Sequence, residues 1–283
     1  MSKTIQYDQF YTHSEEVEKC LNLLSQYYDM NSYDCVFEPA AGTGAFYKKF
    51  PKDKAVGWDI EPACDGVVQQ DFYTASYNFP TNTITISNPP FGRKASDAFR
   101  FMNICCGFSK VVAMVLPRIF MKHTSLNRID RHFHLIDSCD VTKFVLPDGE
   151  IRNVSCVFQI WEKRNYLREL IVKPSFHRDF ELLHRHLSRT TPDELNMIRN
   201  TYDFSIGQNS GRIHDPKTVV AGSHWFVKLR DKNDRKYFEM IDYHRIDDHY
   251  TTHLSLSKKD IIEQYTKNKN ETNNSTTLEN FFG

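Results

Sequence analysis

Residues 83–92 read Thr-Ile-Thr-Ile-Ser-Asn-Pro-Pro-Phe-Gly and join an apolar, β-branched run to a rigid loop. The run predicts a β-strand over 83–86. Two successive prolines cannot donate to a sheet ladder, so the strand must end there. The loop therefore presents an asparagine, Asn88, and an aromatic ring, Phe91, at the carboxyl end of a strand.

The chain around this loop alternates short apolar runs with helix-like segments. Such alternation predicts a mostly parallel α/β sheet with helices on both faces. A turn signal, Pro-Asp-Gly at 147–149, separates the last two runs, which we expect to form an antiparallel hairpin that closes the sheet. The other predicted strands lie at 35–37, 55–58, 67–68, 111–116, 133–136 and 156–161, and the predicted helices at 14–28 (capped by Ser14), 45–50 and 97–108.

In open α/β sheets, ligands bind at the carboxyl ends of the strands. Residues 37–46, Phe-Glu-Pro-Ala-Ala-Gly-Thr-Gly-Ala-Phe, follow the first strand of this series, and their glycines let the backbone approach a ligand and open a helix N-terminus. Asp59 ends the next strand, where a carboxylate can accept from both hydroxyls of a ribose. Asp71 and Phe72 follow the third strand. Singly, each feature also fits a tight turn or a surface aspartate, but four such strand ends in succession are much more specific than any one.

These strand ends resemble those of the S-adenosylmethionine-dependent amino-methyltransferases of the N6-adenine class, which carry an [Asn/Asp/Ser]-Pro-Pro-aromatic motif after the fourth strand. Residues 9–13, Gln-Phe-Tyr-Thr-His, resemble the Phe-Tyr-Thr-Pro segment that precedes the core in the gamma-type motif order, with His13 in place of the proline. Residues 156–163, Cys-Val-Phe-Gln-Ile-Trp-Glu-Lys, resemble the closing strand of phage and large-virus members. The resemblance covers residues 9–164 well and the remainder loosely.

The resemblance implies a Rossmann-like, seven-stranded methyltransferase sheet over 1–165, with S-adenosyl-L-methionine as the cofactor. The histidines at 132, 134, 184 and 186 have no zinc-ligand pattern around them, so we expect no metal. The resemblance also implies which residues contact the parts of that cofactor. The implied cofactor-binding residues are Tyr11 and Thr12 at the methionine end, Glu38, Ala40, Gly42 and Gly44 in the cradle, Asp59 and Ile60 at the ribose and adenine, and Asp71 with Phe72 at the adenine amine.

The implied reaction is site-specific methylation of the N6 amine of an adenine in DNA, by direct in-line displacement. An adenine amine is a poor nucleophile because its lone pair is delocalised into the ring. The Asn88 side-chain oxygen and the Pro89 carbonyl can each accept one amine hydrogen, and Pro89 and Pro90 hold that carbonyl rigidly. Phe91 is expected to stack on the flipped-out base. Phe144, in the closing hairpin, is the candidate for a second stacking ring, although it fits a plain core residue equally well.

The base must leave the stack to enter such a pocket. The formal net charge of the chain is +0, so any contact with phosphates must come from a local patch. Basic residues follow the fourth and fifth strands of the predicted sheet, where they are expected to rim the pocket and meet phosphates, although a solvated charged surface is an equally good interpretation of each one. These residues are Arg93, Lys94, Arg118, Lys122, Arg128 and Arg131.

The strand–helix alternation stops near residue 166. We predict a small target-recognition region over 166–262, with a helix at 179–188 and with base- or phosphate-reading groups among Asn209, Arg212, His224 and Lys228. The polar tail over 263–283 is predicted to be disordered. It ends in Leu278, Phe281 and Phe282, whose spacing resembles a sliding-clamp-binding peptide with Ser275 in place of the usual glutamine. The alternative is that the tail folds back onto its own domain.

Composition is that of a globular protein, with 40% hydrophobic and 25% charged residues. The first residues contain no apolar signal-peptide core, and no apolar run reaches transmembrane length. None of the seven cysteines forms a Cys-x-x-Cys pair, which favours reduced, structural thiols. We therefore expect an intracellular, soluble protein of the cytoplasm, or of the host-cell cytoplasm if it is viral, with the nucleus left open.

Three other functions fit the same motifs. Adenosine N6-methylation of RNA, including the cap-adjacent adenosine, also uses Asn-Pro-Pro-Phe. Glutamine N5-methyltransferases share Asn-Pro-Pro-aromatic because an amide nitrogen poses the same chemical problem. A degenerate methyltransferase fold kept as a binding module is the non-enzymatic alternative, against which Asn88, Asp59 and Asp71 argue because all are present.

Overall fold

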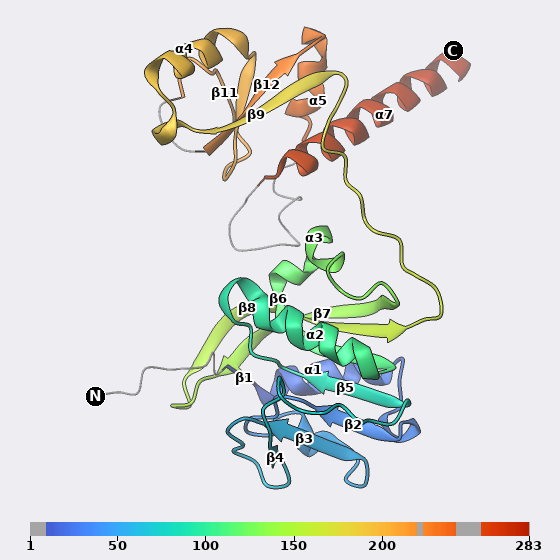
Figure 1. Ribbon diagram of the computed structural model, residues 1–283. Helices are drawn as coiled ribbons and strands as arrows, with labels where there is room; N and C mark the ends of the chain where they lie inside the picture. Colours follow the sequence, from blue (N-terminus) through green and yellow to red (C-terminus); the bar gives the residue numbers. More distant parts are fainter. Residues whose placement is uncertain (1–9, 220–222, 242–255, 283) are drawn as a thin grey trace. The chain divides into compact units, whose positions relative to one another are not determined.

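The computed structural model describes residues 10–219, 223–241 and 256–282 (Figure 1). The chain divides into two compact units, residues 1–171 and 172–283. The boundary lies a few residues beyond the predicted one at 165, because residues 164–171 are tied to the first unit. Arg168 Nη2 donates to the carbonyl of Leu126 at 2.8 Å, and the backbone N–H of Ile171 donates to Asn127 Oδ1 at 3.0 Å.

The first unit is built on an eight-stranded sheet with the order β1-β7-β8-β6-β5-β2-β3-β4. Strands β2 to β6 pair in parallel, β8 lies antiparallel between β6 and β7, and β1 pairs antiparallel with β7. The predicted mostly parallel Rossmann-like α/β sheet with an antiparallel closing hairpin is confirmed, and β1 adds an eighth strand at the edge. The strands are β1 Tyr11–Thr12, β2 Cys35–Glu38, β3 Ala55–Asp59, β4 Val68–Gln69, β5 Thr83–Ser87, β6 Val111–Pro117, β7 Phe133–Val145 and β8 Ile151–Lys163.

Hydrophobic side chains cover both faces of this sheet. Strand β6 shows the two-residue period directly, since Val112 and Met114 join one core cluster while Val111 and Ala113 join the other. Helix α2 (Ser96–Phe108) packs into the first cluster and helix α1 (Ser14–Ser25) into the second. The three-layer arrangement leaves the ends of the parallel strands as the place where a ligand can enter.

The helix predicted at 14–28 is confirmed as α1, although its cap and its end differ from the prediction, and the helix predicted at 45–50 is wrong. The cap of α1 is His13, whose Nδ1 accepts from the backbone N–H of Glu15, and the helix ends at Ser25 instead of residue 28. The helix predicted at 45–50 is reduced to the 3₁₀ turn η2 (Tyr47–Lys49). A proline at position 51 disfavours helical backbone in Phe50, which is extended at φ −79° and ψ 154°, so the turn stops there. Helix α2 confirms the prediction at 97–108.

The remaining elements of the first unit are short. Strands β7 and β8 run into the predicted turn at 147–149, where Gly149 takes a φ of 88° and its N–H donates to the carbonyl of Leu146 at 2.9 Å. The short helical elements are η1 Met30–Ser32, η3 Arg93–Ala95, η4 Arg118–Met121 and α3 His123–Leu126.

The second unit contains a four-stranded antiparallel sheet with the order β11-β10-β12-β9. Helix α4 packs on one face through Ile198, and helices α5 and α7 pack on the other through Phe238 and Tyr265. Its elements are β9 Phe180–His186, η5 Leu187–Arg189, α4 Pro192–Thr201, β10 Phe204–Gly207, β11 Ile213–His214, β12 Ser223–Leu229, η6 Lys232–Asp234, α5 Arg235–Glu239 and α7 Lys258–Phe282.

The helix predicted at 179–188 is wrong, because residues 180–186 form strand β9. Phe180 and Leu182 pack into the core on the α7 side of the sheet, whereas Leu183 packs with the α4 side. This alternation has a period of two, and β9 pairs with the full length of β12, so tertiary pairing decides the conformation.

The disordered tail predicted over 263–283 is also wrong for residues 263–282, which belong to helix α7. Ile261, Ile262 and Tyr265 are fully buried and anchor this helix in the core of the second unit. The side chains of Leu278, Phe281 and Phe282 lie outside the described residues, so the clamp-peptide prediction rests on sequence alone.

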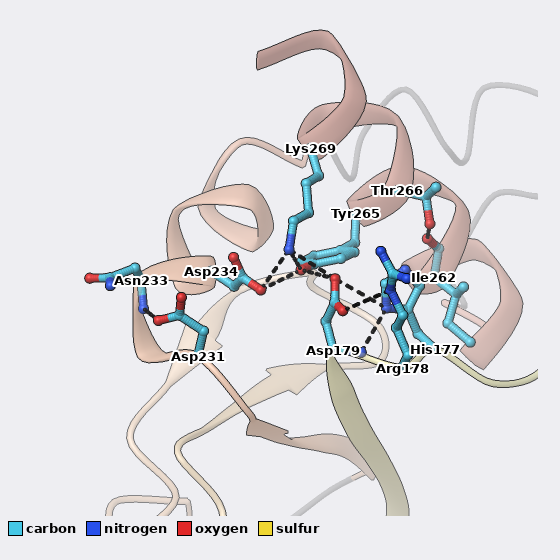
Figure 2. Close-up of polar contacts among 10 residues, drawn as sticks. All are labelled: His177, Arg178, Asp179, Asp231, Asn233, Asp234, Ile262, Tyr265, Thr266 and Lys269. Atoms are coloured by element: carbon cyan, nitrogen blue, oxygen red, sulfur yellow. Dashed lines mark hydrogen bonds and ion pairs between the residues drawn. The ribbon is translucent and has the colours of Figure 1, made fainter. Parts of the chain in front are cut away.

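A polar cluster fixes α7 to the rest of the second unit (Figure 2). Lys269 Nζ donates to Asp179 Oδ2 at 2.8 Å and to Asp234 Oδ2 at 2.9 Å, and the Tyr265 hydroxyl donates to the same two oxygens at 3.1 and 2.8 Å. These contacts join the helix to the segment before β9 and to η6. Among the helices of the described ranges, none has the length and apolar character needed to cross a bilayer.

Candidate active site

A cavity of about 300 Å³ lies where β2, β3, β4 and β5 end. Strand β1 supplies two further lining residues, so the added edge strand belongs to the site. The cavity brings together residues that the sequence places far apart, as the strand-end pattern predicts. The predicted site residues that line it are Tyr11, Thr12, Glu38, Ala40, Gly42, Asp59, Ile60, Asp71, Phe72, Asn88 and Pro90.

The glycine turn after β2 is held by Asp59. The N–H of Gly42 donates to Asp59 Oδ2 at 2.7 Å, and the N–H of Glu61 donates to Oδ1 at 2.8 Å. Gly42 has a φ of 49°, and a Cβ there would lie 2.7 Å from the ring of Tyr11, so only glycine fits. Each carboxylate oxygen of Asp59 accepts one backbone hydrogen and keeps a lone pair for a ligand hydroxyl.

Glu38 is a buried acid in the wall of this cavity. Its side chain is 2% exposed, and no donor in the described part of the chain reaches Oε2. Burial raises the pKa of Glu38 well above its ordinary value, the backbone hydrogen bond from Tyr47 opposes that rise, and the charge of Asp59 adds to it. The buried site therefore favours the neutral form of the Glu38 carboxyl.

Asn88 is oriented by a backbone contact with the segment before β1. Its Nδ2 donates to the carbonyl of Phe10 at 2.6 Å. The same amide then presents Oδ1, which is buried and accepts from no group among the described residues. Thr12 Oγ1 is likewise buried without a partner within the described ranges. Buried polar groups are normally paired, so these atoms mark places that a ligand can complete.

Asp71, the acidic residue that follows β4, lies next to aromatic side chains. Asp71 Oδ1 accepts from the N–H of Tyr73 at 2.8 Å. Phe72 is buried and stacks on Phe101 with ring centroids 4.4 Å apart. Asp71 is thereby fixed by the backbone of its own loop, with Phe72 as part of the core beneath it.

Some predicted site residues do not line the cavity. Gly44 is a turn glycine, since a Cβ there would lie 2.4 Å from Cys64 Sγ. Pro89 is buried behind the loop, and the half-buried ring of Phe91 packs against both core clusters. Phe144 is 0% exposed and packs edge-on against Phe10, with ring centroids 6.3 Å apart. The prediction that Phe144 stacks on a base is therefore wrong, and its interpretation as a core residue is confirmed.

The basic residues predicted at the rim lie outside the cavity lining, and several have structural contacts. Arg118 pairs with Asp140. The Arg128 guanidinium lies 3.6 Å from the centroid of the Phe99 ring, and Arg131 Nε donates to the carbonyl of Arg168 at 3.0 Å. Lys122 is half-buried and has an interaction of its own, whereas Arg93 is exposed. The side chain of Lys94 lies outside the described residues.

The candidate recognition residues of the second unit differ in exposure. Asn209 and Arg212 are exposed in the turn between β10 and β11, and Lys228 is exposed on β12. His224 is buried and has an interaction within the unit, so its predicted role in reading bases is not supported.

The sequence patterns missed several lining residues, of which Asp97 is the most distant from its motif. It follows a loop in which Gly92 and Ala95 both take positive φ angles, of 65° and 60°. Those two residues turn the chain so that the first turn of α2 meets the cavity. The available signal was the start of a helix soon after Asn-Pro-Pro-Phe. The missed polar and aromatic lining residues are Phe10, Thr43, Phe46, Glu61, Gln70, Tyr73, Asp97 and Phe101.

No protein-family model and no curated protein sequence matches the chain. Among solved structures, it is similar to a proposed RNA methyltransferase from Pyrococcus horikoshii, at 16% identity over 57% of this chain and 90% of the other, with a TM-score of 0.46. It is also similar to the 23S rRNA methyltransferase ErmE, at 15% identity over 59% of this chain and 74% of that one, with a TM-score of 0.36. It is similar as well to a SAM-dependent methyltransferase from Anabaena variabilis, at 10% identity over 55% of this chain and 87% of the other, with a TM-score of 0.32.

Proposed function

We propose that this chain is a methyltransferase that transfers a methyl group from S-adenosylmethionine to the N6 amine of an adenine in DNA. The observation that carries the proposal is the orientation of Asn88. Its Nδ2 is committed to the carbonyl of Phe10, so its Oδ1 stands at the cavity as a buried acceptor without a donor among the described residues. An acceptor fixed in this way suits an exocyclic amine.

The lining of the cavity fits the proposed cofactor. Asp59 retains lone pairs for ribose hydroxyls, Asp71 can accept from the adenine amine, and Glu38 with the unpaired Thr12 hydroxyl suits the charged amino-acid end. Glycine at position 42 lets the turn approach the ring of Tyr11, which also lines the cavity. The cofactor would supply an electrophilic methyl group on a sulfonium.

The role of Asn88 is to hold and activate the acceptor nitrogen. By accepting one amine hydrogen, Oδ1 draws the nitrogen lone pair out of conjugation with the ring, and the Pro89 carbonyl is proposed to accept the other. Pro89 and Pro90 restrict the backbone, and the contact with Phe10 restricts the side chain, so neither acceptor has to reorganise during the reaction. Asparagine does not titrate, so the proton leaves to water after transfer.

Recognition of DNA is assigned to groups outside the cavity. Phe91 is proposed to stack on the flipped base through the part of its ring that is not buried against the two core clusters. Exposed Arg93 and exposed groups of the second unit, such as Arg212 and Lys228, are proposed to meet phosphates or bases. A sliding clamp that binds the tail at 278–282 would be a further partner.

The test is mass spectrometry of nucleosides after incubation with S-adenosylmethionine and, separately, duplex DNA, single-stranded DNA and capped RNA. N6-methyldeoxyadenosine in duplex DNA is the expected product. A product in RNA alone would replace DNA by RNA as the substrate. Methylation of a glutamine peptide alone would move the function to proteins, and failure to bind S-adenosylhomocysteine would refute the proposal as a whole.

Asn88→Ala should separate chemistry from binding. We expect transfer to fall by at least about 10²-fold, because a preorganised acceptor is lost, while affinity for S-adenosylhomocysteine changes less than about threefold. Asn82→Ala is the matched control, since Asn82 donates to the carbonyl of Ser32 and does not line the cavity. Retention of most of the rate in Asn88→Ala would show that the mechanism is wrong.

A further inference from the structure

One wall of the cavity contains a tyrosine hydroxyl that the proposed function does not yet use. Tyr73 lines the cavity, and its hydroxyl is buried in the cavity wall. The ring is held in place by the Arg100 guanidinium, 3.8 Å from its centroid, and by Phe101, which meets it edge-on at 5.2 Å. The ring is therefore rigid, and its hydroxyl is a fixed polar group in the cavity wall that a ligand can meet.

Asp97 lies on the same wall, in the first turn of α2. Its N–H donates to the carbonyl of Phe91 at 3.2 Å, and its carboxylate covers Gly92, where a Cβ would lie 2.2 Å from Oδ2. Burial is the main cause of a raised pKa of Tyr73, the charge of Asp97 is the next, and a side-chain hydrogen bond between the Tyr73 hydroxyl and Asp97 adds to the rise. The carboxylate and the phenol are therefore neighbours.

Asp71 completes this group from the other side of Tyr73. Its Oδ1 accepts from the N–H of Tyr73, so the backbone of Tyr73 adjoins one carboxylate and its hydroxyl adjoins the other. The same cavity contains the unpaired, nine-tenths buried side chains of Thr12 and Glu38, which identifies it as a built ligand site and not a chance acidic surface.

We propose that Asp97 and Tyr73, together with Asp71, recognise the amino edge of an adenine ring held in this cavity. The inference deepens the proposed function and rests on it. An adenine amine carries two hydrogens that point apart, so Asp71 takes one and Asp97 takes the other. The Tyr73 hydroxyl donates to the ring nitrogen beside the amine, which is an acceptor in adenine.

This arrangement selects against 6-oxopurines. Hypoxanthine and guanine carry an oxygen acceptor where adenine carries its amine, so the two carboxylates would face that oxygen with no hydrogen to share. Their N1 is protonated, so it cannot accept from the Tyr73 hydroxyl as the adenine nitrogen does. The adenine could belong to the cofactor or to the target base. Because the proposed adenine site adjoins Asp71, the cofactor is the favoured source of the adenine. The two sources can be separated experimentally.

The first measurement is calorimetric binding of S-adenosylhomocysteine and S-inosylhomocysteine to the full chain. We expect the wild type to prefer the adenosyl compound by about 100-fold or more, as sites built to hydrogen-bond a ligand group do. Asp97→Asn should weaken binding of S-adenosylhomocysteine about tenfold. It should also reduce the preference for this compound over S-inosylhomocysteine, because the amide N–H of asparagine can donate to the 6-oxygen of hypoxanthine. Tyr73→Phe should weaken adenosyl binding about fivefold while leaving a folded ring in place.

Asp53→Asn is the matched control, because Asp53 is exposed and lies outside the cavity. The substitution removes the same charge as Asp97→Asn. A second arm measures methylation of an adenine-containing oligonucleotide in competition with oligonucleotides that carry inosine at the target or the flanking position. If Asp97→Asn alters only this arm, the target base is the adenine recognised. If both arms match the wild type for Asp97→Asn and Tyr73→Phe, the inference is overturned while the proposed function stands. If the wild type binds neither homocysteine compound, the proposed function itself fails.

Discussion

Glu38 is a buried residue that is expected to lower the stability of the fold at neutral pH and to strengthen ligand binding. Its carboxyl has a pKa raised mainly by burial, so the folded protein holds the proton more tightly than the unfolded chain, whose glutamate titrates near pH 4.3, about the model-peptide value. Stability then falls as the pH rises from the unfolded pKa to the folded one. We expect Glu38→Gln to be more stable than the wild type at neutral pH.

The same substitution should weaken binding of the ligand. A neutral amide cannot balance an ammonium group, so we expect affinity for S-adenosylhomocysteine to fall about tenfold in Glu38→Gln. Urea unfolding between pH 4 and 8 measures the first effect, and the gain in stability should vanish towards the acid end. Equal stability at all pH values would show that Glu38 is not neutral in the folded cavity.

Phe144 lies in strand β7, and its burial there makes it a core residue. In β7 its ring is fully buried against Phe10, so Phe144→Ala should lower the free energy of unfolding by about 3–5 kcal/mol, and Phe144→Leu by about 1 kcal/mol. Phe144→Leu should keep its transfer rate per folded molecule, which is measured after active-site titration with S-adenosylhomocysteine. A large loss of rate with unchanged stability would restore Phe144 as a stacking residue.

Helix α7 depends on the cluster around Lys269 (Figure 2). Lys269→Met removes the cation that Asp179 and Asp234 share, while Arg178 remains as a partner of Asp179. The side chains of the two aspartates are 18% and 10% exposed. We expect a loss of about 1–3 kcal/mol, below the figure for a fully buried pair because solvent reaches the cluster. Lys267→Met is the control on the same helix, since Lys267 is 62% exposed and should change stability by less than about 0.5 kcal/mol.

The pH dependence of this cluster follows from Asp179. Burial raises the pKa of Asp179, but hydrogen bonds from Lys269 and Tyr265 outweigh burial and lower it below the ordinary value. A lowered carboxyl pKa stabilises the fold above the unfolded pKa, about 3.9, and that stability is lost as the pH falls through the folded pKa. The difference between the wild type and Lys269→Met should therefore shrink below about pH 4, and a constant difference would contradict the assignment.

The elements of the first unit were largely predictable, because strand ends in a parallel sheet converge whatever the loops between them do. Asp59, Asp71 and Asn88 meet for that reason. Asp97 could not be placed, since its approach depends on two positive φ angles in the loop before α2. The helix predicted where β9 lies failed because pairing with β12, which is distant in sequence, overrides local periodicity.

At the scale of the whole molecule, the cavity belongs to the first unit alone, because its lining residues all fall between positions 10 and 101. A chain that ends at residue 171 retains both core clusters of that unit, together with Arg168, whose guanidinium donates to the carbonyls of Leu126 and Ile129. We therefore expect it to fold and to bind S-adenosylhomocysteine within about threefold of the full chain, as independent domains do.

Methyl transfer to an oligonucleotide should nevertheless fall by at least about tenfold in the shortened chain, because the proposed recognition groups Arg212 and Lys228 are absent. Raising the oligonucleotide concentration should restore part of the rate, since the loss is in binding and not in chemistry. Full transfer at low oligonucleotide concentration would remove the second unit from target recognition. Loss of S-adenosylhomocysteine binding, in contrast, would show that residues 172–283 are needed to keep the cavity formed.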